Sequence, residues 1–140
     1  MVQDRSPRAL EVKRIHPFVW GHIVAALIAG AGLGTTLDAQ AAIMGAIALM
    51  AGAVISSTVC WWKPGLDAPA WRLIPVAILA NPLMLAAIGF ILADADCVLG
   101  NKRGWDCLGA AIAIIVSGVC LVPPFGGWVG RWWGRRASKG

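Results

Sequence analysis

Charged residues are scarce in this chain, and four long stretches contain none at all. Only 14% of the 140 residues are Asp, Glu, Lys or Arg, whereas soluble domains carry about 25%. The uncharged stretches are residues 18–37, 39–62, 73–93 and 108–130. A helix of roughly 20 apolar residues crosses the hydrocarbon core of a bilayer. The sequence therefore predicts an all-α, polytopic membrane protein with four transmembrane helices in an antiparallel bundle.

The four stretches also lack the polar face that a helix needs where it meets water. A soluble helical bundle is therefore excluded, and the chain is expected to form one membrane domain over residues 17–130. Residues 1–16 and 131–140 are basic segments on either side of it. Ala-Gln-Ala at residues 39–41 resembles the cleavage site of an export signal. The preceding apolar run is too long for such a signal, so we expect the first span to be retained.

Negative charge is rare, and the net charge is +5. Lys and Arg are enriched in the short cytoplasmic segments of membrane proteins. This rule predicts that both termini are cytoplasmic and that the protein lies in the inner (cytoplasmic) membrane. The basic segments are expected to attract anionic lipid headgroups rather than nucleic acid. The basic residues on the predicted cytoplasmic side are Arg5, Arg8, Lys13, Arg14, Lys63, Arg72, Arg131, Arg135, Arg136 and Lys139.

Tyrosine is absent, so tryptophan must supply the aromatic residues that favour the headgroup level. Six tryptophans fall near the predicted cytoplasmic interface, at positions 20, 61, 62, 71, 128 and 132. The expected interface anchors are Trp61, Trp62, Trp71, Trp128, Trp132, Arg131, Arg135 and Arg136.

Helix boundaries are marked by proline and aspartate. Pro17 suits the first turn of the first span, and Asp38 is placed to cap the second. Pro123-Pro124 is expected to break span four, with Val122 pushed towards an extended conformation. Residues 125–136 would then lie in the membrane interface as an anchor.

Small residues recur at every fourth position in three spans, on one face of each predicted helix. Such residues let helix backbones approach closely in a membrane. The pattern predicts close helix packing, within the chain or against another protein. Its members are Ala26, Gly30 and Gly34 in span one, Ala48, Gly52 and Ser56 in span two, and Gly109, Ala113 and Ser117 in span four.

Asn81-Pro82 lies in the middle of span three. Pro82 removes the helical donor for a carbonyl one turn earlier, that of Ile78, and Asn81 brings an amide into the hydrocarbon. Two interpretations follow. The first is a kink whose polar groups bond to a neighbour, such as Ser117 or the hydroxyls of residues 56–58. The second is a substrate or ion site at a broken helix. We favour the kink because no span has an ionisable Asp, Glu, Lys or Arg.

Cysteine is used sparingly, and no C-x-x-C pair occurs. The chain therefore does not look like a thiol-exchange enzyme. Cys97 and Cys107 flank the loop predicted to face outside, where a structural disulfide is expected. Cys60 and Cys120 are interpreted as small apolar fillers.

Motifs for metal or cofactor binding are also missing. The acidic loop with Asp94, Asp96 and Asp106 does not match an EF-hand, so no metal site is predicted. His22 would ligate haem only with a second ligand from a partner chain. No cofactor is therefore predicted.

These features favour a small, non-enzymatic inner-membrane protein, an accessory, scaffold or assembly subunit that acts through helix packing. The expected partners are the bilayer and other membrane subunits, or a second copy of the chain. The first alternative is a small oligomeric transporter or channel with Asn81 and Pro82 in its pathway. The second is a redox or haem-associated membrane subunit.

Overall fold

The computed structural model describes residues 15–36 and 38–138, and this part of the chain is helical, without strands. Two long helices come first, followed by shorter ones that are joined end to end in two pairs. The elements are α1 (Pro17–Thr36), α2 (Ala39–Trp62), α3 (Ala70–Leu79), α4 (Pro82–Ala93), α5 (Ala95–Val98), the 3₁₀ helix η1 (Trp105–Cys107), α6 (Leu108–Cys120) and α7 (Val122–Ala137).

Three helical segments are long and apolar enough to cross a membrane. They are α1, α2 and the 33-residue run Trp105–Ala137, which contains α6 and α7. Helices α3 and α4 together make a fourth span if one membrane crossing contains the 70° bend between them. The prediction of an all-α, multi-pass membrane protein is confirmed.

The first two helices begin where the sequence indicates. Pro17 opens α1, and the carboxylate of Asp38 accepts a hydrogen bond of 3.0 Å from the N–H of Ala41 in the first turn of α2. His16 adds a cap that was not predicted, because its Nδ1 accepts from the N–H of Phe18 at 3.2 Å. These contacts satisfy backbone donors that the first turn of a helix leaves free.

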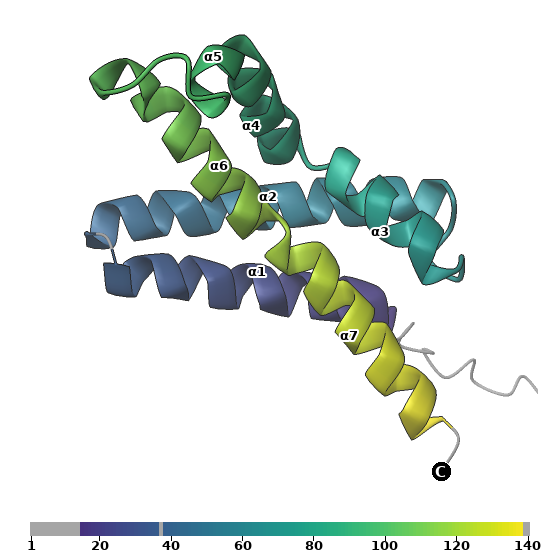
Figure 1. The fold of residues 1–140 in the computed structure, drawn as a ribbon. Coiled ribbons are helices and arrows are strands. Elements are labelled where there is room, and N and C mark those ends of the chain that lie inside the picture. The colour runs from purple at the N-terminus through teal and green to yellow at the C-terminus, as the bar shows by residue number, and fades with distance from the viewer. Residues whose placement is uncertain (1–14, 37, 139–140) are drawn as a thin grey trace, which may run out of the picture.

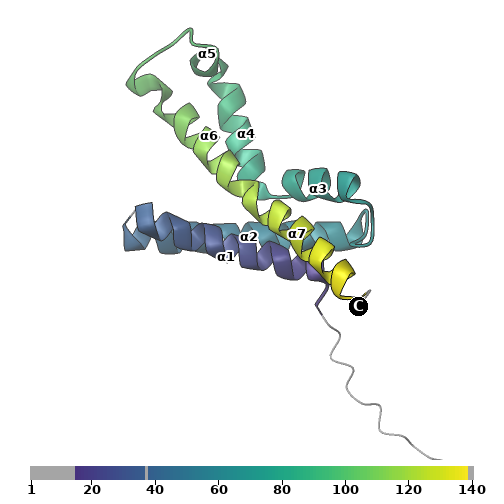
Figure 2. The same cartoon turned by 60° about the horizontal axis from the view of Figure 1, so that its bottom comes forward.

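Two helical hairpins make up the architecture (Figure 1). Helices α1 and α2 lie side by side, and α3 runs back along the second half of α2. Helices α4 and α6 form a second hairpin that leans away from the first, as Figure 2 shows. Helix α7 crosses α1, and this is the most extensive contact between two helices. The bundle is therefore splayed at one side and closed at the other.

Span three is broken at the predicted Asn81-Pro82 step. Helix α3 ends at Leu79, and α4 starts at Pro82, whose missing N–H costs nothing in a first turn. The backbone N–H of Asn81 donates to the carbonyl of Ile78 at 3.2 Å. Because residue 82 is proline, the carbonyl of Ile78 loses its usual helical donor. It accepts a hydrogen bond from the N–H of Asn81 instead.

Span four is also interrupted, but the break lies at Leu121, just before the two prolines, and the chain continues as a helix after it. Helix α6 ends at Cys120, Leu121 forms a turn, and α7 begins at Val122 with Pro123 and Pro124 in its first turn. Val122 is thus the first residue of a helix, and the prediction of an extended conformation there is wrong. Residues 125–136 belong to α7, which packs against α1, and their placement in the membrane interface stays a prediction. Proline at a helix start needs no backbone donor, so two prolines are compatible with α7.

Candidate functional site

Four polar side chains are buried within the described helices. His22 of α1, Ser56 and Ser57 of α2, and Asn81 between α3 and α4 are at most 5% exposed. We call them the buried polar cluster. Gly52 and Ser56 are four residues apart and therefore lie on one face of α2, where Asn81 and His22 meet the helix.

His22 connects α1 to α2 inside the bundle. Its Nε2 lies 3.1 Å from the hydroxyl oxygen of Ser56, and its ring packs against Phe18 with 5.4 Å between ring centroids. The imidazole is fully buried. It is therefore not presented to a haem that a partner chain would share, as the second alternative function would need.

Asn81 is held by its own helix and by a glycine. Its Oδ1 accepts from the N–H of Leu83 at 3.0 Å and so caps α4. A Cβ on Gly52 would stand only 2.6 Å from this oxygen, so the amide fits only because residue 52 is glycine. The predicted partners of Asn81 are wrong: Ser117 and Thr58 bond to carbonyls of their own helices, and Ser56 bonds to His22.

Three polar atoms of the cluster find no hydrogen-bond partner in the part of the chain that the structure describes. They are Nδ1 of His22, Oγ of Ser57 and Nδ2 of Asn81. A buried polar group without a partner costs about 1–3 kcal/mol. The cluster therefore has hydrogen-bonding capacity beyond what this chain's fold uses.

The closest helix crossing joins α1 to α7 through glycines. A Cβ on Gly21 would lie 2.2 Å from the carbonyl oxygen of Gly126, and one on Gly130 would lie 2.5 Å from that of Pro17. The sequence prediction did not include these glycines. Gly126, Gly130 and Gly134 are four residues apart, so the same small-residue rule would have found them.

The predicted small-residue faces are used unevenly. Gly30 packs against Ala46, since a Cβ on Gly30 would lie 2.6 Å from that methyl group. Within the nine predicted positions, Ala26, Gly30, Gly52, Ser56 and Ala113 are buried, Ala48 and Ser117 are half-buried, and Gly34 and Gly109 are exposed.

Arg131 belongs to the predicted interface anchors, but it is only 7% exposed. Its guanidinium donates to the carbonyl of Ala68 and, at 2.8 Å, to that of Asp67. Both acceptors lie in the α2–α3 connection. Arg131 therefore ties α7 to that connection, whereas Arg135 and Arg136 remain exposed.

The other predicted anchors lie at one end of the molecule, where α1 and α3 begin and where α2 and α7 end. Trp71 lies under the guanidinium of Arg72 at 4.6 Å, and Trp132 lies under that of Arg136 at 3.8 Å. The tryptophans here are more than one-third exposed, as side chains at a lipid interface would be: Trp61, Trp62, Trp71, Trp128 and Trp132. Arg5, Arg8, Lys13, Arg14 and Lys139 lie outside the described residues.

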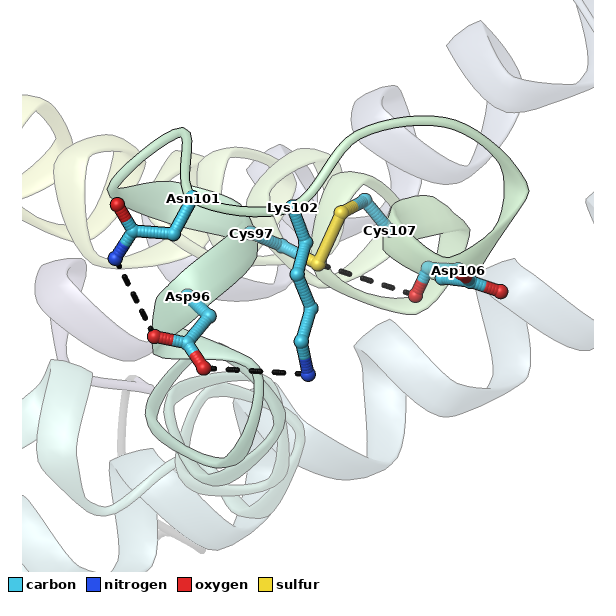
Figure 3. The surroundings of a disulfide bond; sticks show 6 residues. All are labelled: Asp96, Cys97, Asn101, Lys102, Asp106 and Cys107. Carbon is cyan, nitrogen blue, oxygen red and sulfur yellow. Dashed lines mark hydrogen bonds and ion pairs between the residues drawn. A yellow bond between two sulfur atoms is a disulfide. The ribbon is translucent and has the colours of Figure 1, made fainter.

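Cys97 and Cys107 form a disulfide in the loop that joins α4 to α6, with 5.4 Å between their Cα atoms (Figure 3). Asp96 in the same loop pairs with Lys102 at 3.9 Å and accepts from Asn101 at 3.4 Å. The loop is therefore closed by a covalent bond and a small polar network. Cys60 and Cys120 are free and buried.

The chemistry that the structure gathers is that of hydroxyl, imidazole and amide groups in an apolar surround. Within residues 15–36 and 38–138, no group of three or more His, Cys, Asp or Glu side chains is arranged to hold a metal ion. Comparison of the chain with protein-family models, with curated proteins and with solved structures gives no match.

Proposed function

We propose that this chain is a structural subunit of an inner-membrane assembly, with a second polypeptide packed between its two hairpins. The observation that carries this proposal is the divergence of the α4/α6 hairpin from the α1/α2 hairpin, which begins at the 70° bend after α3. A helix from another subunit would pack against both hairpins. The small residues at the α1/α7 and α1/α2 crossings are used for packing within the chain, so a partner would contact other faces.

Large aliphatic side chains on both hairpins are exposed and could contact a partner. Ile43 and Ile47, one helical turn apart on α2, are each 60% exposed, and Ile112 on α6 is 52% exposed. Lipid chains would cover these aliphatic side chains as well as a partner helix would, because lipid chains and a membrane helix are both apolar. The experiment must therefore separate a protein partner from lipid.

Photo-crosslinking in the native membrane makes that separation. A photoreactive amino acid at position 47 should give one discrete adduct with a second protein. The same amino acid at the exposed Trp105 position, in the disulfide loop, serves as the control and should not give that adduct. Native mass spectrometry after mild detergent extraction should then show the adduct protein at fixed stoichiometry. A clean monomer, with only lipid adducts at position 47, would refute the proposal.

We further propose that the end of the molecule bearing Lys63, Arg72, Arg135 and Arg136 faces the cytoplasm and anionic headgroups. The positive-inside rule supports this orientation, and the disulfide at the other end suits an oxidising compartment. In a background with Cys60 and Cys120 replaced by alanine, Ser138→Cys should react with an impermeant maleimide only after lysis. Labelling of Ser138→Cys in intact cells would reverse the orientation.

Transport is the second candidate, favoured by the buried Nδ2 of Asn81 at a broken helix. Liposomes containing the protein would be tested for passage of K⁺, Cl⁻ and glycerol. A transport role predicts flux that falls in Asn81→Ala, whereas the open-face control Gly89→Ala should be unaffected. No flux of any of these probes, or flux that Asn81→Ala leaves unchanged, would remove Asn81 from a transport pathway.

A further inference from the structure

A groove runs beside the crossing of α1 and α7, and its described lining is apolar. One side is formed by Trp20 and Val24 of α1, and the other by Val129 and Trp133 of α7. The groove has a volume of about 490 Å³, within the range of about 300–1,000 Å³ typical of ligand sites. Its size and lining therefore suit an apolar chain.

The groove extends from one end of the molecule towards its middle. Pro17, where α1 begins, and Gly134, near the end of α7, line it at the end where the exposed anchor tryptophans lie. Ile28 lines it further along α1, about 16 Å from Pro17 at 1.5 Å per helical residue. The groove therefore leads from the headgroup level into the hydrocarbon region, which is the path of a lipid acyl chain.

Two tryptophans flank the groove near its outer end. Trp20 is 56% exposed, and Trp133 is 69% exposed. Tryptophan favours the headgroup level because its ring is apolar and its N–H needs a polar partner. The two rings would therefore flank an acyl chain, and their N–H groups would donate to the ester or phosphate oxygens above it.

Arg136 supplies a phosphate-binding group beside the same groove. It follows Val129 by seven residues and Trp133 by three, so it lies on the groove-lining face of α7. Side chains of a helix lean towards its N-terminus, which brings the guanidinium back to the level of the groove. The guanidinium lies 3.8 Å from the ring centroid of Trp132. Stacking uses the face of the guanidinium and leaves its in-plane N–H donors to bind a phosphate.

The charge at this end of the molecule selects the type of headgroup. The described charges there include a single acidic residue, Asp67, whereas the basic ones are Lys63, Arg72, Arg131, Arg135 and Arg136. A positive surface attracts an anionic headgroup and disfavours one that carries an ammonium group. An anionic phospholipid therefore fits both the groove and its surroundings.

We propose that the groove binds one anionic phospholipid, with its phosphate on Arg136 and one acyl chain between Trp20 and Trp133. The second acyl chain remains in the bilayer. This is a defined site with one lipid per chain, in contrast to a general attraction of basic segments for anionic headgroups. It needs the basic end to lie at headgroup level, on either side of the membrane. Labelling of Ser138→Cys in intact cells, or a missing protein adduct at position 47, would therefore leave it standing.

The test uses the full-length protein in detergent micelles, titrated with phosphatidylglycerol or with phosphatidylethanolamine and read by native mass spectrometry. We expect saturable binding of one phosphatidylglycerol per chain, and no saturable binding of phosphatidylethanolamine in the same concentration range. Arg136→Gln should raise the dissociation constant of phosphatidylglycerol about tenfold, because a charge-assisted hydrogen bond is lost. This residue is exposed near the end of α7, so the variant should fold normally.

The matched charge control is Arg135→Gln. Arg135 follows Arg131 by four residues, so it lies on the face of α7 that meets the α2–α3 connection, away from the groove. This variant loses the same charge and should bind phosphatidylglycerol nearly as the parent protein does.

The acyl-chain part of the site is tested by Val24→Phe. Val24 is 42% exposed and lines the groove, so a larger side chain there should abolish saturable binding without disturbing the core. Val54→Phe is its control, because Val54 is half-exposed on α2 and lies outside this groove. Circular dichroism should show equal helicity in all variants.

Three results would overturn the proposal. Equal weakening by Arg135→Gln and Arg136→Gln would mean that the basic end attracts anionic lipid only in general. Equal, non-saturating binding of both lipids would mean that lipid only surrounds the protein. Unchanged binding of phosphatidylglycerol in Val24→Phe would show that the acyl chain does not lie in the groove.

Discussion

Replacing Gly126 with alanine should weaken the whole fold, because this glycine lies at the closest approach of α1 and α7. A Cβ at position 126 would stand 2.2 Å from the Cβ of Ala25 and 2.7 Å from the carbonyl oxygen of Gly21. Carbon atoms in contact normally lie about 3.5–4.0 Å apart. The two helices would therefore have to separate by more than about 1 Å.

The magnitude follows from two opposing effects. Alanine is a better helix former than glycine by about 0.5–1 kcal/mol. Overpacking a tight contact costs about 1–3 kcal/mol, and occasionally more. Because one of the obstructing atoms is a backbone carbonyl, we expect the steric cost to win. Gly126→Ala should lower the free energy of unfolding by up to about 2.5 kcal/mol, which is the steric cost less the gain in helix propensity.

The assay is unfolding by SDS titration from mild detergent micelles, followed by circular dichroism. Gly118→Ala is the matched control, because a Cβ there meets nothing within 4 Å. It should be neutral or stabilising by about 0.5–1 kcal/mol. Adding Ala25→Gly to Gly126→Ala should restore part of the stability, but not all, since the carbonyl of Gly21 still obstructs. A Gly126→Ala protein as stable as the Gly118→Ala control would refute the α1/α7 crossing.

The remaining predictions concern the Arg131 contact and the disulfide. Arg131→Ala should lower the free energy of unfolding by about 2–3 kcal/mol and expose residues 63–69 to limited proteolysis, because the carbonyls of Ala68 and Asp67 lose a charged donor. Arg131→Lys, with one ammonium for two carbonyls, should be intermediate, and unchanged proteolysis in Arg131→Ala would contradict the contact. Replacing Cys97 and Cys107 together with serine should cost about 3 kcal/mol, from the loop entropy of a separation of 10 residues. An equal melting temperature with and without reductant would show that the bond does not stabilise the fold.

Local features of the sequence predicted much of the fold. Charge-free stretches locate the helices, Pro17 and Asp38 locate two helix starts, and Asn81-Pro82 locates the break in span three. Each of these depends on groups within a few residues of one another. The Cys97–Cys107 pairing was also predicted, since the two cysteines lie close in sequence at the two sides of one loop.

Contacts between helices were predicted less well, and the polar cluster shows why. Asn81 was expected to bond with Ser117 or with the hydroxyls of residues 56–58. It caps its own helix instead, and its amide packs against Gly52. Sequence reasoning can identify a buried polar group that needs partners, but the partners depend on which helix faces meet.

The sequence alone determined that this chain is a multi-pass helical membrane protein, because apolar length and helix-end chemistry are local properties. Only the tertiary structure decided that α7 lies along α1, that Arg131 is buried, and that the two hairpins diverge. The physical reason is that α1, α2 and α4 are apolar nearly all round. Such helices carry no polar stripe to orient them, so close approach at individual glycines selects the faces that pack.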